Sequence, residues 1–218
     1  AIVHTAMYDA VVAAYHAKYT YNRKMPSAAG NDIVAAAAVT SDPSYPSAHA
    51  AIAAAAAAAL TYLFPDQAKT LAAMAQEAGI ARLLAGTNYR SDVDAGMALG
   101  QAVADKATAR AAADGSDAKF TGTIPTGPGL WAGTNPVEPL AGTWKPWLMT
   151  SGNQFRPGTP LAFGSPDYLA QLADVKRINA SLSPSERDDA VFWGSMAGGI
   201  WLRVADSLVA RDGLSTPT

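Results

Sequence analysis

Residues 43–49, Pro-Ser-Tyr-Pro-Ser-Ala-His, bring a hydroxyl and an imidazole to the start of an alanine-rich stretch. Residues 50–60 are all alanine except at positions 52 and 60, and because alanine has the best helix propensity, they predict a buried helix. Ser47 is its expected N-cap. The free N–H groups and partial positive charge of a helix N-terminus favour an oxyanion such as phosphate. The alternative is that Ser47 is only a cap and that His49 is a first-turn residue near the surface.

A basic and aromatic segment, residues 18–26, precedes this motif. Residues 1–17 carry apolar side chains at helical spacing, which predicts an amphipathic helix that Lys18 ends. The chain must leave helical geometry before Pro26, because the residue before a proline avoids the α conformation. Three cations within seven residues, from Lys18 to Lys24, suit an anionic ligand. A solvated basic loop with tyrosines packed on the domain explains the segment equally well.

Two helical segments are predicted on either side of the alanine-rich helix. A short one at residues 33–39 leads into the central motif, and a longer one begins after Pro65 and runs to Gly86. Arg82 lies near the C-terminal end of the longer helix. There it either complements the helix dipole or binds an anion.

A further helix is predicted after residue 90. Ser91 is its expected cap, and the helix runs to about Ala113. It carries Gly96 and Gly100 four residues apart, a spacing that lets a neighbouring helix approach closely.

The composition limits the classes of protein to which the chain can belong. With 218 residues, 50% hydrophobic content and a net charge of −2, we expect a globular protein with one large domain or two small ones. No apolar run approaches the roughly 18 to 20 residues that cross a bilayer, and the near-neutral charge argues against a nucleic-acid partner. The absence of cysteine excludes disulfides and thiolate sites. The three histidines show no convincing ligand spacing, so no metal site is predicted.

The second half of the chain changes in character at residue 115. Residues 115–164 are rich in glycine, proline and tryptophan, and we expect them to wrap the surface, because disordered linkers are poor in aromatic residues. Residues 165–218 read as helices, with a cap-proline start at Ser165 and a capping box at residues 183–186. Gly198-Gly199 is expected to break or bend the last of them.

Three of these segments together resemble the family of type 2 phosphatidic acid phosphatases and vanadium-dependent haloperoxidases. That family binds phosphate or vanadate in an all-α helical bundle through three motifs: Lys, six residues, Arg-Pro; then Pro-Ser-Gly-His; then Ser-Arg, five residues, His, three residues, Asp. The corresponding residues here are Lys18 with Met25-Pro26, then Pro46-Ser47-Ala48-His49, then Ala81-Arg82 with Asn88 and Asp92. Order and spacing agree throughout, and the segment at 115–164 resembles bacterial haloperoxidase-like members.

The resemblance implies a role for each matching residue. Lys18, Ser47, Ala48 and Arg82 would bind the oxyanion, the backbone N–H remaining where Ala48 replaces glycine. His49 would be the general acid that protonates the leaving oxygen. In the family the residue that matches Asp92 orients the nucleophilic histidine, whose position here is Asn88.

Two departures bear on function. Asn88 replaces the histidine that attacks phosphorus or bonds vanadium, and an amide nitrogen is neither basic nor nucleophilic. Met25 replaces an arginine, for which Arg23, Lys24 or Arg90 could partly compensate. We therefore expect a degenerate oxyanion site and a structural or assembly role. The alternative is an active acid phosphatase-type phosphomonoester hydrolase or a vanadium-dependent haloperoxidase.

These inferences give an expected organisation for the chain. Residues 1–114 form the helical core with the three motifs, residues 115–164 wrap it, and residues 165–218 are helices that pack on it. Phosphate or vanadate is the expected occupant of the site, and a homo-oligomer or an intact copy of the fold is the expected partner. The resemblance favours an extracytoplasmic location.

The ends of the chain suggest how it relates to a longer product. The sequence opens in mid-helix without an initiator methionine, and residues 213–216, Gly-Leu-Ser-Thr, are similar to a stretch that in relatives leads into the helix that here begins at residue 1. We expect a processed piece, a permuted arrangement or a tandem duplication.

Overall fold

The computed structural model describes residues 1–213 except residues 31, 37–40 and 196, and this part of the chain is helical with no strand. The all-α fold expected from the sequence is therefore confirmed. The chain divides into two compact units. The helical unit contains Ala1–Gly122 and Asn135–Arg156, and the second unit contains Thr123–Thr134 and the chain from Pro157 onward.

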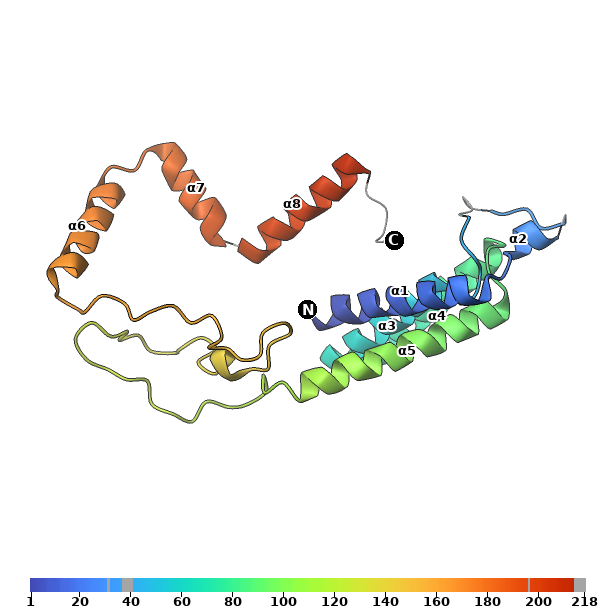
Figure 1. The fold of residues 1–218 in the computed structure, drawn as a ribbon, viewed down its shortest axis with the longest axis horizontal. Helices are drawn as coiled ribbons and strands as arrows, with labels where there is room; N and C mark the ends of the chain where they lie inside the picture. The colour runs from blue at the N-terminus through green and yellow to red at the C-terminus, as the bar shows by residue number, and fades with distance from the viewer. Residues whose placement is uncertain (31, 37–40, 196, 214–218) are drawn as a thin grey trace. The chain divides into compact units, whose positions relative to one another are not determined.

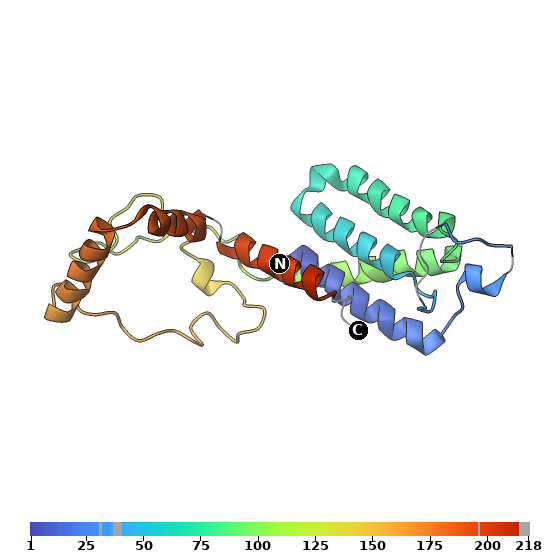
Figure 2. The same ribbon diagram turned by 90° about the horizontal axis from the view of Figure 1, so that it is seen from above.

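The helical unit is built around α3 (Ala48–Leu63), the alanine-rich helix. It packs against α1 (Ile2–Tyr21), α4 (Ala68–Leu84) and α5 (Arg90–Ala112), and α1 also packs against α5 (Figures 1 and 2). The short 3-10 helix η1 (Pro65–Gln67) turns the chain between α3 and α4. The site motifs therefore lie on helices that share one central partner.

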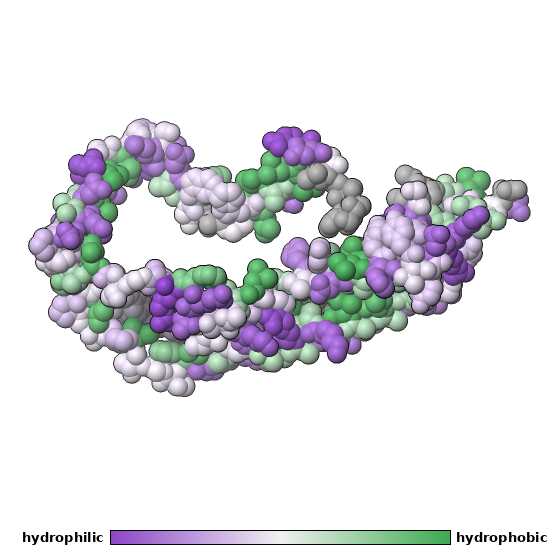
Figure 3. All heavy atoms as spheres, viewed as in Figure 1, coloured by the Kyte–Doolittle hydropathy of each residue, from purple (hydrophilic) through white to green (hydrophobic). Residues whose placement is uncertain are grey.

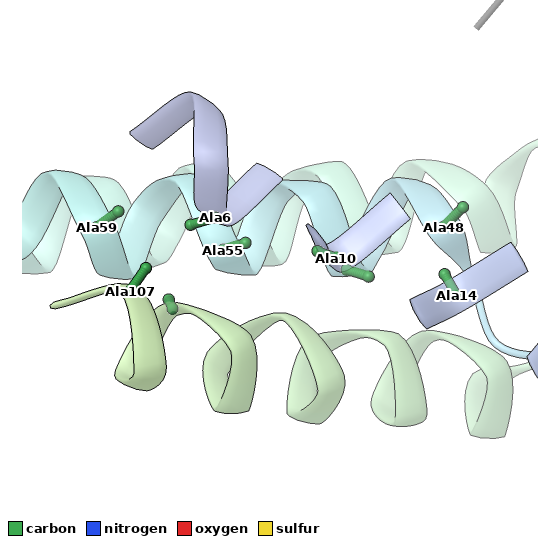
Figure 4. Packing of buried hydrophobic residues seen from close by; sticks show 9 residues of the cluster. Ala6, Ala10, Ala14, Ala48, Ala55, Ala59 and Ala107 are labelled. Atoms are coloured by element: carbon green, nitrogen blue, oxygen red, sulfur yellow. The ribbon is translucent and has the colours of Figure 1, made fainter. Parts of the chain in front are cut away.

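Alanine fills the core of this unit. The buried cluster consists of Ala6, Ala10 and Ala14 on α1, Ala48, Ala51, Ala55 and Ala59 on α3, and Ala104 and Ala107 on α5 (Figure 4). Small side chains allow the helix backbones to approach closely. A Cβ atom at Gly96 or Gly100 would overlap the carbonyl oxygen of Ser47 or Ala51, so the predicted close approach at this glycine pair is confirmed.

Three helix boundaries differ from the sequence predictions. Helix α1 continues past Lys18 to Tyr21, where Asn22 adopts the left-handed conformation (φ 47°) and donates its N–H to the Lys18 carbonyl at 2.8 Å. Helix α5 is capped by Tyr89 and not by Ser91, because its third residue, Asp92, accepts the Tyr89 N–H at 2.8 Å. Residues 33–36 are not helical, and the rest of the stretch predicted at 33–39 lies outside the described residues.

A short helix, α2 (Pro26–Ala29), follows the basic segment, with Met25 as its extended N-cap. Proline at the first helical position has a favourable fixed φ and needs no hydrogen-bond acceptor for an N–H. Met25, which stands where the pattern of the first motif has arginine, thus lies directly before the buried Pro26.

The second unit carries α6 (Pro166–Ala180), α7 (Pro184–Ser195) and α8 (Ala197–Asp212). Both predicted helix starts are confirmed: Ser165 Oγ accepts the Tyr168 N–H at 3.2 Å, and Ser183 and Glu186 exchange the two bonds of a capping box. Helix α7 ends at Ser195, before the predicted break at Gly198-Gly199, which lies inside α8.

Much of the surface of these three helices is apolar and exposed. Leu202 and Trp201 on α8 and Val191 on α7 are all more than 60% exposed, and Figure 3 shows hydrophobic surface over α8. In the sequence between α5 and α6, residues 115–164 contain one 3-10 helix, η2 (Ala141–Thr143), and are largely exposed. The predicted wrapping of 115–164 and packing of 165–218 on the core stay predictions.

Within the described residues, none of the helices is both long enough and apolar enough for a bilayer crossing.

Candidate anion-binding site

The start of α3 is the centre of the candidate site. Ser47 is its N-cap, as predicted: the Ser47 Oγ accepts the N–H of Ala50 at 3.3 Å. Its own N–H donates to the carbonyl of Asp92 at 2.9 Å and so links the first turns of α3 and α5. Ser47 is 1% exposed. Because the Oγ accepts in the cap, its O–H proton stays available for another acceptor.

Lys18 continues the buried face of α1 beyond Ala14. Its ammonium donates to the carbonyl of Pro43, just before the central motif. Burial lowers the pKa of Lys18, and the carboxylates of Asp42 and Asp92 oppose that change. An ammonium has three donors, so the bond to Pro43 leaves two for a ligand.

The loop that precedes α3 is held against α1 by Asp42. Tyr15 and Tyr19 each donate a phenolic O–H to this carboxylate at 3.2 Å. The pKa of Tyr15 is raised, first by burial and then by the negative charge of Asp42. These two hydrogen bonds hold the loop against α1, next to the contact between Lys18 and Pro43.

Arg82, near the end of α4, directs its guanidinium to Thr87. Its Nε and Nη2 donate to the Thr87 Oγ1 at 3.3 and 3.1 Å. The Arg82 carbonyl accepts the N–H groups of Thr87 and Asn88 at 3.2 and 3.3 Å. Within the third motif, Arg82 therefore holds the turn that follows α4 through its carbonyl and directs its cation to Thr87.

His49 lies in the first turn of α3 with its side chain exposed. Its pKa is lowered, first by partial burial and then by the positive charges of Arg82 and Lys18. The two cations act on this imidazole, so residues from α1, α3 and α4 share one electrostatic environment. That environment is positive and suits an anion.

Asn88 is buried and bonded on both sides of its amide. The Nδ2 donates to the carbonyl of Ser44 at 2.7 Å, and the Oδ1 accepts from Thr87 Oγ1 at 3.3 Å. These bonds join the third motif to the loop before α3. Asn88 is thus a bridge between backbone segments, and its amide has no nucleophilic lone pair to offer.

Asp92 is fully buried and paired with Arg23. Its Oδ1 lies 2.7 Å from the Arg23 Nη1, and its Oδ2 accepts the Tyr89 N–H. The same Arg23 nitrogen donates to Ser91 Oγ at 2.8 Å, and the guanidinium stacks over the Tyr89 ring at 4.0 Å. Sequence reasoning left the direction of Arg23 open, because its partners lie almost 70 residues away.

The remaining site positions contribute no charge. Met25, at the arginine position of the first motif, is 8% exposed, and a thioether cannot form the bidentate fork of a guanidinium. Ala48 is buried in the first turn of α3. Lys24 and Arg90, the other cations considered as substitutes, are exposed.

The residues gathered here have the chemistry that an oxyanion favours, and position 88 holds an amide. Lys18, Arg82 and His49 supply cationic or donor side chains next to a helix N-terminus, where anions are stabilised. The donor set does not fit a covalently held vanadate, since position 88 offers an amide engaged with Ser44 and no imidazole. Cations and hydrogen-bond donors of this kind are the groups by which proteins hold phosphate or sulfate.

Comparison with known proteins matches the helical unit to one family. Residues 2–109 match the model of the PAP2 superfamily, a span that covers all three motifs and helices α1 to α5 except the last residues of α5. No curated protein matches the chain.

Proposed function

Residues 2–109 belong to the PAP2 superfamily, and from that premise we propose that this chain binds a phosphate-type oxyanion without hydrolysing phosphate esters. Membership supports a phosphatase-type function at most. The proposal adds that the hydrolytic step has been lost and that the chain serves as a structural or assembly subunit, as a homo-oligomer or beside an intact copy of the fold.

The proposal rests on the chemistry at position 88. The Asn88 amide replaces the nucleophile and is bonded to the Ser44 carbonyl at 2.7 Å. Asp92, which would orient a histidine there, is paired with Arg23. Members of a catalytic unit act together, so the loss of the nucleophile removes most of the rate.

The binding half of the site supports the retained function. Lys18, Arg82 and His49 keep their positive or donor character beside the N-terminus of α3. Charge-assisted hydrogen bonds to an anion contribute about 1.5–3 kcal/mol each. The arginine missing at Met25 weakens the site without abolishing it.

The test combines a binding and a turnover measurement on the same chain. We expect inorganic phosphate to bind in a calorimetric titration, and Arg82→Gln to weaken it about tenfold, because one charged hydrogen bond is lost. Lys106→Gln removes a cation from the exposed face of α5 and is the matched control, expected to leave the affinity unchanged.

The turnover measurement uses a generic phosphomonoester such as p-nitrophenyl phosphate. We expect no hydrolysis above the uncatalysed rate from the wild-type chain. Hydrolysis by the wild type that His49→Ala abolishes would show instead an active phosphatase and would refute the proposal.

A further inference from the structure

Arg23 occupies a variable position inside the first motif, between Lys18 and Met25, and has three partners in the site. It bonds to the only fully buried carboxylate among the described residues, Asp92, and to Ser91, and it stacks on Tyr89. All three partners belong to α5 or its cap, whereas Arg23 follows α1 directly. The pair therefore ties the Lys18 end of α1 to the start of α5.

Asp92 has two oxygens, and both are engaged. The Oδ1 is bonded to Arg23 at 2.7 Å, and the Oδ2 accepts the N–H of Tyr89 at 2.8 Å. The second bond places this carboxylate beside the backbone next to Asn88. In the family that the chain resembles, the residue that matches Asp92 orients the histidine at the position of Asn88, whereas here the Asp92 Oδ1 is bonded to Arg23.

We propose that Arg23 is a positioning residue that has replaced an imidazole as the partner of Asp92, so that the carboxylate anchors the site and no longer supports chemistry at position 88. This inference deepens the proposed loss of hydrolysis and rests on it. It also explains how a buried carboxylate is retained after its catalytic partner is gone: without a cationic partner, a buried charge is strongly destabilising.

The pairing is tested by the coupling between positions 23 and 88, measured as thermal unfolding of the full chain without ligand. Arg23→Gln leaves Asp92 buried without its cation, and we expect the melting temperature to fall by about 5–10 °C. In the Asn88→His background the new imidazole takes over the carboxylate, and the same substitution should lower the melting temperature by less than half as much.

Two control substitutions accompany this cycle. Arg23→Lys keeps a cation for Asp92. The fall in melting temperature that it causes should therefore be nearly the same with and without Asn88→His. Arg90→Gln removes an exposed charge close to position 88 without freeing Asp92, and it should act equally in both backgrounds. An additive cycle, including the case in which Arg23→Gln fails to fold in both backgrounds, overturns the inference.

A second readout reports on the introduced imidazole itself. In the Asn88→His variant with Arg23 present, we expect the pKa of this imidazole to stay near or below its ordinary value of about 6.5, since Asp92 is neutralised by Arg23. Adding Arg23→Gln exposes the imidazole to the carboxylate and should raise its pKa by about one unit or more, as followed by NMR titration. Equal values in the two proteins overturn the inference.

Neither readout depends on phosphate or on turnover. Hydrolysis by the wild-type chain would refute the proposed function while leaving the coupling measurable. Conversely, phosphate binding without coupling between positions 23 and 88 would leave the proposed function standing and remove Arg23 from it.

Discussion

Asn88 stands where the pattern that this chain resembles has histidine, and both ends of its amide take part in hydrogen bonds. A buried amide satisfied by the Ser44 carbonyl and the Thr87 hydroxyl stabilises the junction between α4 and α5. Under the proposed function, binding and reaction are therefore separable at the level of single residues.

His49 gives the residue-scale prediction, a pH dependence of anion binding. Its folded-state pKa is lowered, so the imidazole is neutral at neutral pH and gains its charge only below about pH 6.5. Sulfate does not titrate in this range and is the suitable probe. We expect sulfate affinity to rise about two- to fivefold as the pH falls through this region, the gain typical of one exposed charge pair.

The His49→Gln variant is the control for that titration. It should show the same sulfate affinity as the wild type above pH 7 and no rise below it. In the absence of sulfate, the lowered pKa means that the unfolded chain binds the proton more readily. Stability from this group is therefore present above about pH 6.5 and lost as the pH falls, and His49→Gln should remove that loss in thermal unfolding.

Motif spacing singled out Lys18, His49 and Arg82, whose charges act on one another in the structure, but it did not predict the bonds that these segments make. Lys18, Ser47, His49 and Arg82 are recognisable because their order and separation are properties of the sequence alone. The pairing of Arg23 with Asp92 spans 69 residues and depends on how α1 meets α5. No local pattern contains that information.

The N-terminus of α3 serves the fold through its cap and is the proposed seat of the anion. Ser47 caps the helix through its Oγ, and the sequence left open whether it does more. Asparagine and aspartate cap helices about as well as serine. The two substitutions therefore preserve the cap and differ in charge.

This difference supplies an element-scale prediction. Ser47→Asp places a negative charge at the anion seat and should weaken phosphate binding more than about tenfold relative to Ser47→Asn. Isothermal titration of the two variants makes the comparison, with circular dichroism to verify equal helix content. Equal phosphate affinities would mean that Ser47 is a cap and nothing else.

Helix packing gives a second element-scale prediction. A Cβ at Gly100 would overlap the carbonyl oxygen of Ala51, so Gly100→Ala must push α5 away from α3 and should destabilise the protein by roughly 1–2 kcal/mol. Gly198 lies inside α8 with open space around it, and Gly198→Ala should stabilise its helix by about 0.5–1 kcal/mol. Chemical denaturation measures both, and a stabilising effect at Gly100 would contradict the tight contact.

Helix identity was predictable where composition and caps agree, as in α3, α6 and α7. The predicted boundaries failed where a hydrogen bond to a residue three or four positions away outweighed the preference of the residue type. Serine is the better N-cap by residue type, yet Tyr89 precedes α5 because the Asp92 carboxylate is available to its N–H. Helix α1 outlasts Lys18 because the left-handed Asn22, and not the charged residue, ends it.

The chain as a whole places all its site residues in one unit. Residues 18, 47–49, 82, 88 and 92 lie within Ala1–Gly122, whereas the second unit contributes none of them. Its helices instead expose apolar side chains, including Val175, Trp201 and Leu202. Glycine and proline in residues 115–164 predicted an irregular segment there but not how it divides between the two units.

This division leads to a prediction for limited proteolysis. Cleavage requires exposed chain that can adapt to the protease, and residues 157–164 are exposed and lie outside any helix. We expect the first cuts there or in residues 123–134, with α1, α3, α4 and α5 protected by their shared core. Mass spectrometry of a time course identifies the sites.

The nicked protein then tests whether the site is complete within the helical unit. Every group assigned to the anion belongs to that unit, so nicking leaves the charged hydrogen bonds to phosphate unaltered. We therefore expect the phosphate affinity to change less than about twofold, which is within the precision of calorimetry. First cuts inside α3 or α5 would contradict the predicted protection of these helices. A loss of phosphate binding on nicking outside the helical unit would show that residues beyond the three motifs complete the site.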